Sequence, residues 1–415
     1  MRVLQINNCH NRRGGADSVY LNTIQLLKKY GNEVIEFSQL SPSNETSKYA
    51  DLFVDSFDIL QLSFTKKVLK TPRQLYSFEA ARKLTKLIEL TRPEVAHIHL
   101  YKGVLTASIL SVLKKLNVPV AITLHDYSLL CPRNILFNGE NKICEKCINS
   151  SSINCVIHRC NRKNLFYSTI NFVEYNLNNT LFQPDKYFKK IIAVSKFSLE
   201  KHSQRKNLVN HLVHLYNFFP GIQDTTPNHN KGKYYLFFGR LSAEKGLDTL
   251  VDAFGQLGQN YCLKIVGTGP IESALRSKIQ VNQYTNIELL GYQSGEALND
   301  LIKNSSFVIV PSEWYENNPM TIVEGYSFGK PVIGSRVGGI PELILEEITG
   351  FGFEMANAKS LIEAVKKANS ISEDLYDTMS KNARDFAIHN FSENLHYNKL
   401  IAIYNEIISN KIVNQ

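Results

Sequence analysis

Short apolar runs alternate with longer amphipathic segments along most of this 415-residue chain. Runs such as RVLQIN at 2–7 and VAHIHL at 95–100 have the length and composition of buried strands. The segment 18–30, which follows the first run, repeats apolar residues at helical spacing. This regular alternation of strand and helix predicts an α/β protein built on parallel sheets.

The pattern breaks once and then starts again. In the first half we expect strands at 2–7, 33–37, 95–100, 118–125 and 191–195, and helices at 18–30, 73–91 and 104–116. Residues 216–232 are rich in proline, glycine and polar residues, which is typical of a linker. After it we expect strands at 234–241, 261–267, 287–291, 307–312 and 331–335, and helices at 246–257, 271–282, 295–303, 319–328, 359–369, 373–390 and 392–411.

The restart predicts two doubly wound domains. The first spans 1–215 and carries a cysteine-rich insertion at about 131–160; the second spans 233–390. We expect the closing helix, 391–415, to cross back to the first domain. Two such domains usually bind their ligand in the cleft between them, at the carboxyl ends of their strands.

Composition narrows the class of protein. Hydrophobic residues make up 43% and charged residues 20% of the chain, as in soluble globular proteins. No apolar run reaches the roughly 18 residues that span a bilayer. The amino terminus has the pattern of a strand and lacks the apolar core of a secretory leader. We therefore expect a cytoplasmic protein.

The net charge of +9 is unevenly distributed. Residues 1–215 contain 30 Lys and Arg against 16 Asp and Glu, whereas the remainder contains 17 against 22. A basic surface attracts anionic ligands, anionic lipid or nucleic acid. The sequence has no nucleic-acid-binding signature, so we expect phosphate or lipid and no nucleic acid.

The stretch YENNPMTIVEG at 315–325 holds two glutamates eight positions apart. Pro319 suits the first turn of a helix, and Asn318 suits the N-cap position before it. Glu316 then lies in the preceding loop and Glu324 in the second helical turn. The free amides at a helix start form an anion site. A carboxylate beside that site makes sense if it faces hydroxyl groups, such as those of a sugar.

Six further segments occur in a characteristic order around this stretch. They are RRGGAD at 12–17, LHDYSLLCP at 124–132, FFGRLSAEKG at 237–246, IVGTGP at 265–270, LLGYQSGEAL at 289–298 and GKPVIGSRVGGIPELI at 329–344. Together with the E-x7-E spacing of Glu316 and Glu324, their order resembles glycosyltransferase family 4, whose members are retaining enzymes with the GT-B fold. The resemblance covers nearly the whole chain.

The resemblance implies roles for particular residues. Glu324 would bind the ribose of a UDP- or GDP-linked sugar donor, and Glu316 would touch the transferred sugar. Arg240 and Lys245 would neutralise the diphosphate, whose negative charge grows as it departs. His125 would lie beside the reacting sugar. The remaining implied donor-binding residues are Gly14, Gly15, Ser195, Gly239, Tyr292, Asn317, Asn318, Pro319 and Met320.

The implied reaction moves a hexosyl unit from a nucleoside diphosphate to a hydroxyl group with retention of configuration. We expect no side-chain nucleophile and no catalytic cofactor, because the leaving phosphate can accept the proton of the acceptor. No Asp-x-Asp occurs, which argues against a metal-bound diphosphate. The pair Asn317–Asn318 stands where many members have a Phe-Gly, so the identity of the donor sugar does not carry over.

Each motif, taken alone, also has an interpretation that involves no function. An E-x7-E pair occurs by chance, a double glycine is often only a turn, and a single histidine is often structural. The rival functions are a non-catalytic nucleotide-sugar-binding subunit, a GT-B epimerase, hydrolase or phosphorylase, and a dinucleotide-dependent oxidoreductase. The last needs a G-x-G-x-x-G, and the GTGPIE at 267–272 lacks its third glycine.

Five of the seven cysteines lie between residues 131 and 160. Cys144, Cys147, Cys155 and Cys160 have the spacing C-x2-C-x7-C-x4-C, which permits a structural zinc site. In a reducing cytoplasm, metal binding is favoured over disulfides. The alternative is a set of reduced thiols in a loop on the acceptor side.

The stretch LQLSFTKKVLKTPR at 60–73 mixes apolar and basic residues. Such segments bind anionic membrane surfaces, although the same pattern also fits a solvated helix with one buried face. Bacterial members of the family often glycosylate acceptors linked to a lipid diphosphate. We therefore expect a glycan or polyprenyl-diphosphate-linked acceptor, a peripheral position at the inner face of the cytoplasmic membrane, and a place in capsule, O-antigen or exopolysaccharide synthesis.

Overall fold

A computed structural model describes residues 1–56 and 72–413. The chain divides into two compact units. Unit 1 takes the chain up to Glu140, then Cys144–Leu215 and the residues from His396 onward. Unit 2 takes Asn141–Ile143 and Tyr216–Leu395. The stretch 60–73, predicted to touch a membrane, lies almost entirely outside the described residues.

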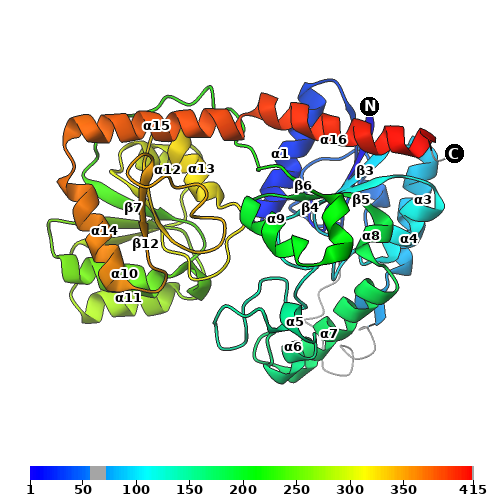
Figure 1. Cartoon of the computed structure of the whole chain (residues 1–415), viewed down its shortest axis with the longest axis horizontal. Helices are drawn as coiled ribbons and strands as arrows, with labels where there is room; N and C mark the ends of the chain where they lie inside the picture. Colours follow the sequence, from blue (N-terminus) through cyan, green and yellow to red (C-terminus); the bar gives the residue numbers. More distant parts are fainter. Residues whose placement is uncertain (57–71, 414–415) are drawn as a thin grey trace. The chain divides into compact units, whose positions relative to one another are not determined.

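Unit 1 is built on a parallel sheet with the strand order β2-β1-β3-β4-β5-β6 (Figure 1). Its strands are β1 (Arg2–Ile6), β2 (Glu33–Phe37), β3 (Val95–Ile98), β4 (Val120–Leu124), β5 (Phe188–Ala193) and β6 (Leu212–His214). Its main helices are α1 (Gly15–Lys29), α3 (Phe78–Thr91), α4 (Ser108–Lys115), α7 (Leu165–Thr180) and α9 (Lys196–Ser203). The shorter turns are η1 (Ala50–Leu52), α5 (Lys146–Asn149), α6 (Asn154–Ile157), α8 (Pro184–Tyr187) and η3 (Lys206–His211).

The two faces of this sheet bury different helices. Because side chains alternate along a strand, Leu4 and Ile6 point to the face covered by α3 and α4. Val3 points to the other face, where it packs with α1 and with α16 (Glu393–Val413). From α16, Leu400, Tyr404 and Ile407 enter this core and are at most 1% exposed. The last helix therefore completes one wall of unit 1.

Unit 2 is built on a second parallel sheet, with the order β12-β11-β10-β7-β8-β9. Its strands are β7 (Tyr234–Phe238), β8 (Cys262–Val266), β9 (Ile287–Gly291), β10 (Val308–Val310), β11 (Val332–Ser335) and β12 (Gly350–Phe353). Its helices are α10 (Leu247–Leu257), α11 (Glu272–Val281), α12 (Gly295–Lys303), α13 (Met320–Ser327), α14 (Ala358–Ser370) and α15 (Glu373–Phe391), with a single turn, η4 (Ala243–Lys245).

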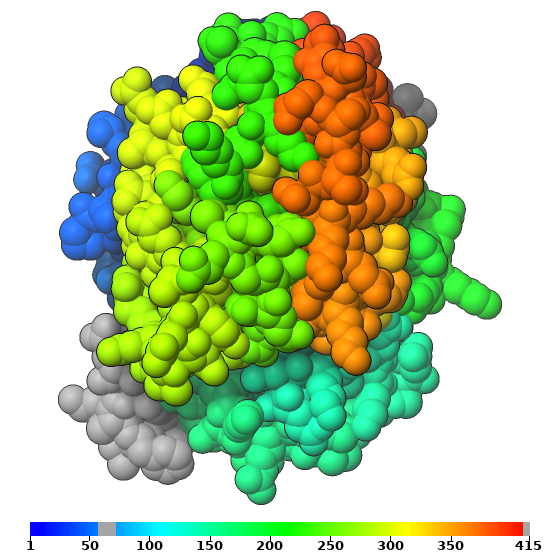
Figure 2. Space-filling view, turned by 90° about the vertical axis from the view of Figure 1, so that its left-hand side faces the viewer, coloured from blue at the N-terminus to red at the C-terminus, as the bar shows by residue number. Residues whose placement is uncertain are grey.

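Both faces of the second sheet are also covered. One core joins the sheet to α10 and α14, and the other joins it to α13 and α15. Figure 2 shows α14 and α15 in orange on the surface of this unit, beside the green and yellow-green segment that contains α10 and α11. The predicted fold class, two doubly wound parallel sheets, is confirmed.

Several element boundaries differ from those predicted. The helix predicted at 73–91 is interrupted: residues 72–75 are helical, and α3 begins at Phe78 after an N-cap at Ser77. Helix α7 and strand β12 were not predicted from the sequence. Helix α13 begins at Met320 with Pro319 in the N-cap position, so the assignment of Asn318 as N-cap was wrong. Among the described helices, none is both long enough and apolar enough to cross a bilayer.

Candidate functional site

The centre of the candidate site is an ion pair at the carboxyl edge of the second sheet. Strands β7 and β10 are neighbours, so the loops that follow them leave the sheet side by side. Lys245 lies in η4 after β7, and Glu316 lies in the loop after β10. The Lys245 Nζ is 2.5 Å from the Glu316 Oε1, although 71 positions separate the two residues.

The Glu316 carboxylate is held in its ionised form. Burial leaves its side chain only 9% exposed, which by itself opposes ionisation. The Lys245 ammonium, the Trp314 side chain and the Ser312 hydroxyl, which donates to Oε1 at 2.7 Å, outweigh that effect and lower the pKa of Glu316. Ser312 is fixed in turn by Ser335, whose hydroxyl donates to the Ser312 carbonyl at 2.6 Å. The pair is therefore a pre-arranged charge pair on a rigid support.

The loop that carries Lys245 closes tightly on the strand beside it. Gly246 ends η4 with φ 69°, a backbone conformation that favours glycine. A Cβ at this position would lie 1.9 Å from the carbonyl oxygen of Pro311, the residue after β10. Only glycine lets the two loops approach this closely, and the approach brings Lys245 to Glu316.

The start of α13 adds hydrogen-bond donors next to this pair. The Asn318 Oδ1 accepts from the backbone N–H of Asn217 at 3.2 Å, which orients its side-chain amide. Within the described part of the chain the Asn318 Nδ2 is buried and has no hydrogen-bond partner. A buried donor without a partner is unfavourable unless a ligand supplies the acceptor. Pro319 and Met320 follow, where the first backbone amides of α13 point out of the helix.

Glu324 lies one turn further along α13 and differs from Glu316 in its environment. It is partly buried, and burial raises the pKa of its carboxyl to about 7. Among the described residues, no cation or hydrogen-bond donor compensates its charge. A carboxylate in this state gains the most from hydroxyl groups that donate to it, such as a vicinal diol.

The other predicted residues of unit 2 also follow carboxyl ends of strands. Gly239 and Arg240 come directly after β7, and the Arg240 side chain is exposed. The backbone N–H of Gly239 donates to the Val266 carbonyl at 3.0 Å, which ties this loop to the end of β8. Tyr292 follows β9 and is 71% exposed. These residues share one edge of the sheet with Lys245 and Glu316.

The predicted site residues of unit 1 differ in their surroundings. His125 follows β4, and its Nε2 lies 2.9 Å from Nδ1 of the buried His99; burial lowers the pKa of His125 to about 4. Gly14 and Gly15 begin α1 with open space around both Cα atoms. The Ser195 hydroxyl is fully buried and caps α9 by accepting from the Ser198 N–H at 3.0 Å. Its side chain therefore has a local structural role.

Two residues of this arrangement were missed by the sequence analysis. Ser312 positions Glu316. It could have been found from the sequence, because it is the last residue of the predicted strand 307–312 and polar residues at strand ends often belong to a site. His99 contacts His125, but a single histidine in a strand region carries no signal of its partner. The sequence pattern alone could not have identified it.

The cysteines of the insertion lie near one another. Cys155 hydrogen-bonds to Cys160 and lowers the pKa of the Cys160 thiol to about 7. Burial, together with Cys131, Cys160 and Cys144, raises the pKa of Cys147 to about 12. Across residues 1–56 and 72–413, no group of three or more His, Cys, Asp or Glu side chains is arranged to hold a metal ion. The thiols are thus gathered without a preformed metal geometry, and the zinc site stays a prediction.

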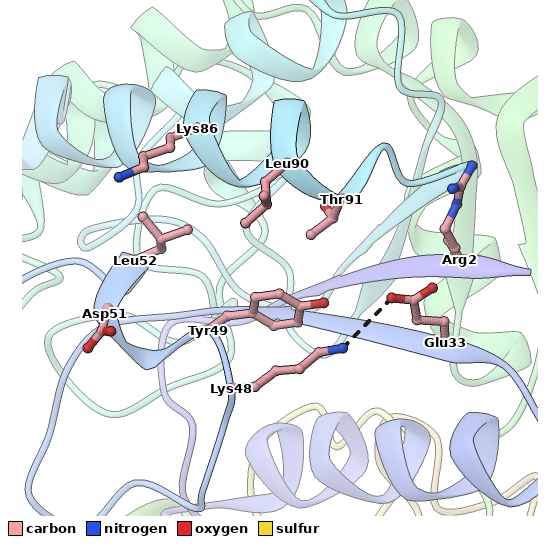
Figure 3. Close-up of a pocket in the computed structure, with 9 residues that line it drawn as sticks. All are labelled: Arg2, Glu33, Lys48, Tyr49, Asp51, Leu52, Lys86, Leu90 and Thr91. Atoms are coloured by element: carbon pink, nitrogen blue, oxygen red, sulfur yellow. Dashed lines mark ion pairs between the residues drawn. The ribbon is translucent and has the colours of Figure 1, made fainter.

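A surface pocket of unit 1 lies elsewhere. Figure 3 shows it between the start of the sheet and α3, with Tyr49 and Leu90 pointing into it and an ion pair of 3.8 Å between Lys48 and Glu33. Arg2 and Glu33 are the first residues of β1 and β2, so this pocket lies at the amino ends of the strands. Ligands of doubly wound sheets bind at the opposite, carboxyl ends.

Comparisons with known proteins agree with this geometry. Residues 221–386 match the family described as Glycosyl transferases group 1. An uncharacterized glycosyltransferase of Methanocaldococcus jannaschii is 32% identical over 200 residues, which cover 48% of this chain and 54% of that protein. The Escherichia coli protein named UDP-Gal:alpha-D-GlcNAc-diphosphoundecaprenol alpha-1,3-galactosyltransferase is 29% identical over 184 residues, 43% of this chain and 46% of that protein. The chain therefore spans about half the length of these two relatives.

A solved structure resembles nearly the whole chain. The crystal structure of HepE from Anabaena in complex with UDP and glucose superposes with a TM-score of 0.68. It covers 98% of this chain and 100% of that chain at 17% sequence identity. This likeness shows that the fold is of the GT-B type.

Proposed function

We propose that this chain, in which residues 221–386 form a Glycosyl transferases group 1 domain, transfers a glycosyl unit from a nucleoside-diphosphate sugar to a hydroxyl group with retention of configuration. The observation that carries the proposal is the 2.5 Å pair of Lys245 and Glu316 at the carboxyl edge of the second sheet. It combines a fixed cation for a leaving phosphate with a carboxylate for sugar hydroxyls.

The cations would stabilise the departing nucleoside diphosphate. Negative charge grows on its oxygens as the glycosidic bond breaks, and a cation already in position stabilises that charge without reorganisation. The Lys245 ammonium is held by Glu316 before a donor binds. Arg240, which follows β7, would supply the second cation. The backbone amides at the start of α13 would add the partial positive charge of a helix amino terminus.

The carboxylates would recognise hydroxyl groups. Glu324 has a raised pKa because burial opposes its ionisation, so two hydroxyl donors from a ribose would favour its charged form. Glu316 already has Lys245 and Ser312 as partners on one oxygen, Oε1. Its other oxygen would accept from the transferred sugar, and the buried Asn318 Nδ2 would donate to the same sugar.

We propose that the chemistry needs no covalent enzyme intermediate. Retaining hydrolases place two carboxylates about 5 Å apart across the reacting carbon, and one of them attacks it. Here Glu316 is neutralised by an ammonium at 2.5 Å, which makes it a poor nucleophile. The leaving phosphate would instead accept the proton of the acceptor hydroxyl on the same face of the sugar. Catalysis would then consist of positioning and charge stabilisation.

The donor would carry a uridine or guanosine base. HepE of Anabaena was crystallised in complex with UDP and glucose, and the name of the Escherichia coli relative begins with UDP-Gal. These two proteins support a UDP-hexose as the first donor to test. The exposed ring of Tyr292 after β9 would flank the base.

The acceptor would be a glycan on a lipid diphosphate, used for a cell-surface polysaccharide. The relative whose name contains diphosphoundecaprenol supports this class of acceptor. Such lipids reside in the membrane, so the enzyme would work at its cytoplasmic surface. A surface of unit 1 suits contact with the membrane. We call it the insertion patch, and it consists of Ile153, Ile157, Arg159, Arg162, Lys163 and Leu165.

The insertion patch joins apolar and basic side chains in one short segment. Ile157 and Leu165 are 65% and 54% exposed. Arg159 and Lys163 line a shallow pocket together with Leu165. Apolar insertion combined with cations is the combination that binds an anionic bilayer.

The experiment that tests the proposed function has two stages. Thermal unfolding with UDP, GDP and their hexose conjugates identifies the base and the sugar, because a ligand at saturating concentration raises the midpoint of unfolding. The best donor is then incubated with lipid-diphosphate-linked glycans, and the anomeric configuration of the product is determined by NMR. Retained configuration with wild type, and no product with Glu316→Gln, is the expected result. Binding of a donor without transfer to any acceptor contradicts the proposal.

A further inference from the structure

A chain of buried hydrogen bonds runs through unit 1 and ends at His125. Its members come from four elements that are distant in sequence. In order along the chain they are His125, His99, Gln5, Tyr404, His97 and Thr123.

Sheet register places these residues on one face. Gln5 of β1 pairs with His97 of β3, and His97 pairs with Ala121 of β4. Because side chains alternate, Thr123 and His125 lie on the same face, as does His99. This face is covered by α1 and α16 (Figure 1), and α16 contributes Tyr404. Gln5 and Tyr404 have no exposed surface.

The first half of the chain links His125 to Gln5. The His125 Nε2 lies 2.9 Å from the His99 Nδ1, and the His99 Nε2 lies 3.1 Å from the Gln5 Oε1. An amide oxygen can only accept, so the hydrogen of His99 is on its Nε2. Burial lowers the pKa of His99 well below its usual value, so the ring is neutral and carries that single hydrogen. The His99 Nδ1 is therefore an acceptor, and the His125 Nε2 must donate to it.

The second half starts from the Nε2 of the same Gln5 amide and gives a consistent direction. The Gln5 Nε2 donates to the Tyr404 Oη at 3.2 Å, and the Tyr404 hydroxyl has one hydrogen, which it donates to the His97 Nδ1 at 2.6 Å. His97 is also neutral, since burial lowers its pKa to about 3. Its hydrogen is then on Nε2, which lies 2.7 Å from the Thr123 Oγ1. Each of these hydrogen bonds then has one donor and one acceptor.

The orientation of one amide therefore sets the tautomer of His125. Rotating the Gln5 amide by half a turn would exchange its donor and acceptor and reverse every hydrogen bond on both sides. We propose that Gln5 and Tyr404 are positioning residues that hold His125, through His99, as its Nε2–H tautomer with the lone pair on Nδ1. In that state the Nδ1 accepts a hydrogen bond from a substrate hydroxyl. Only this last step rests on the proposed function.

The tautomer can be measured in the free protein without any substrate. Histidine is labelled with ¹⁵N, and the ring nitrogens of His125 are assigned by comparison with His125→Asn. We expect a pyridine-like shift for the His125 Nδ1 and a pyrrole-like shift for its Nε2 in the wild type. The opposite pattern, or an equal mixture of the two tautomers, overturns the inference.

Two variants and one control test what holds the tautomer. Tyr404→Phe removes the acceptor of the Gln5 amide, and Gln5→Met removes the acceptor of His99; each is expected to produce a mixture of His125 tautomers. The control is Tyr20→Phe. Tyr20 is equally buried, its hydroxyl lies 2.9 Å from the His10 Nδ1, and its ring touches His99 at a centroid distance of 5.5 Å. The control is expected to leave the His125 shifts unchanged. Unchanged shifts in both Tyr404→Phe and Gln5→Met overturn the inference.

Kinetics separate this inference from the proposed function. We expect Tyr404→Phe to lower kcat by about two- to tenfold, the equivalent of one ordinary hydrogen bond, with the donor KM nearly unchanged. Tyr20→Phe should keep the wild-type kcat. A Tyr404→Phe enzyme as fast as the control contradicts a role in turnover. If the chain transfers no sugar at all, the proposed function fails, while the nitrogen shifts still decide the inference about the tautomer.

Discussion

The ammonium of Lys245 and the carboxylate of Glu316 lie 2.5 Å apart in the loops that follow two neighbouring strands. A cation that already has a partner needs no further ordering when a diphosphate arrives. The pair also prevents the buried carboxylate from being protonated, because its pKa is lowered.

Replacing Lys245 with alanine should lower turnover by about 10²- to 10³-fold, the usual effect of removing one group that stabilises developing charge. Arg240→Ala should act in the same direction. The matched control is Lys278→Ala, whose side chain is 26% exposed, like that of Lys245, and pairs with Asp252 at 2.8 Å. Initial rates at saturating donor measure the effect. Wild-type rates in both Lys245→Ala and Arg240→Ala would contradict the role of these cations in stabilising the leaving diphosphate.

Donor binding should strengthen as pH rises from 6 to 8. The pKa of Glu324 is about 7 in the free protein, so its carboxyl is mostly protonated at pH 6 and ionised at pH 8. Only the ionised form accepts from two ribose hydroxyls. The Kd for a nucleotide sugar, measured by calorimetry, should fall about tenfold over this range. A nucleotide sugar has no phosphate group that titrates there, and Glu324→Gln should bind more weakly without this pH dependence.

The same glutamate should destabilise the free protein. Its folded pKa is above the unfolded value, so the folded state binds its proton more tightly and stability falls as pH rises from about 4.5 to 7. Above pH 7, Glu324→Gln should therefore be more stable than the wild type by on the order of 1–3 kcal/mol. Urea unfolding at pH 5 and pH 8 measures the difference. An equal gain at both values would contradict the raised pKa.

Gly246→Ala should be far more damaging than Gly31→Ala. Both glycines end a helical segment with positive φ, 69° and 78°, but a Cβ at Gly246 meets the Pro311 carbonyl at 1.9 Å while a Cβ at Gly31 meets nothing within 4 Å. The shared backbone strain costs about 1–2 kcal/mol, so the excess loss in Gly246→Ala measures the close approach of the two loops. Denaturant midpoints give both values. Similar losses in the two variants would contradict the tight closure beside Lys245.

Purified protein should contain close to one equivalent of zinc. The cysteines of the insertion shift one another's pKa values; they are Cys131, Cys144, Cys147, Cys155 and Cys160. Thiols bind zinc once they lose their protons. Metal analysis by mass spectrometry measures the content. Cys147→Ser should reduce it, whereas Cys262→Ser, a change at an exposed cysteine outside the insertion, should not. Less than half an equivalent in the wild type would remove the zinc site.

The insertion patch should bind anionic vesicles. Arg159, Arg162 and Lys163 all have positive φ, so asparagine, which tolerates that backbone, removes the charges with little strain. The triple asparagine variant should bind phosphatidylglycerol vesicles at least about tenfold more weakly at low salt. The control replaces Lys264, Arg276 and Lys278 of unit 2 and lowers the net charge equally. Sedimentation with vesicles measures both, and equal losses would assign binding to net charge and not to the patch.

The sequence was sufficient for most of the fold because the strands of both sheets are compact apolar runs. It failed for one helix and one strand. Helix α7 was missed although Phe166, Ile170, Val173 and Leu177 recur in it at helical spacing. Strand β12 has the sequence GFGF, in which glycine weakens the strand signal. The start of α13 was misplaced by one residue, because Pro319 is compatible with either the N-cap or the first turn.

The candidate site was predictable in part. The position of Arg240, Lys245 and Glu316 after strands follows from the alternation of elements, but their proximity depends on β7 and β10 being neighbours. Sequence spacing does not contain that information. The partners of His125 were also out of reach, because Gln5 and Tyr404 are 399 positions apart and meet only in the folded core.

That core has a consequence for how the protein is made. Leu400, Tyr404 and Ile407 fill one face of a sheet whose first strand begins at Arg2. Unit 2 is almost continuous in sequence, whereas unit 1 needs both ends of the chain. On the ribosome, unit 2 can therefore reach its folded state first, and the earliest strands must wait for the last helix to emerge. A stalled or shortened chain would leave that apolar face open to chaperones and proteases.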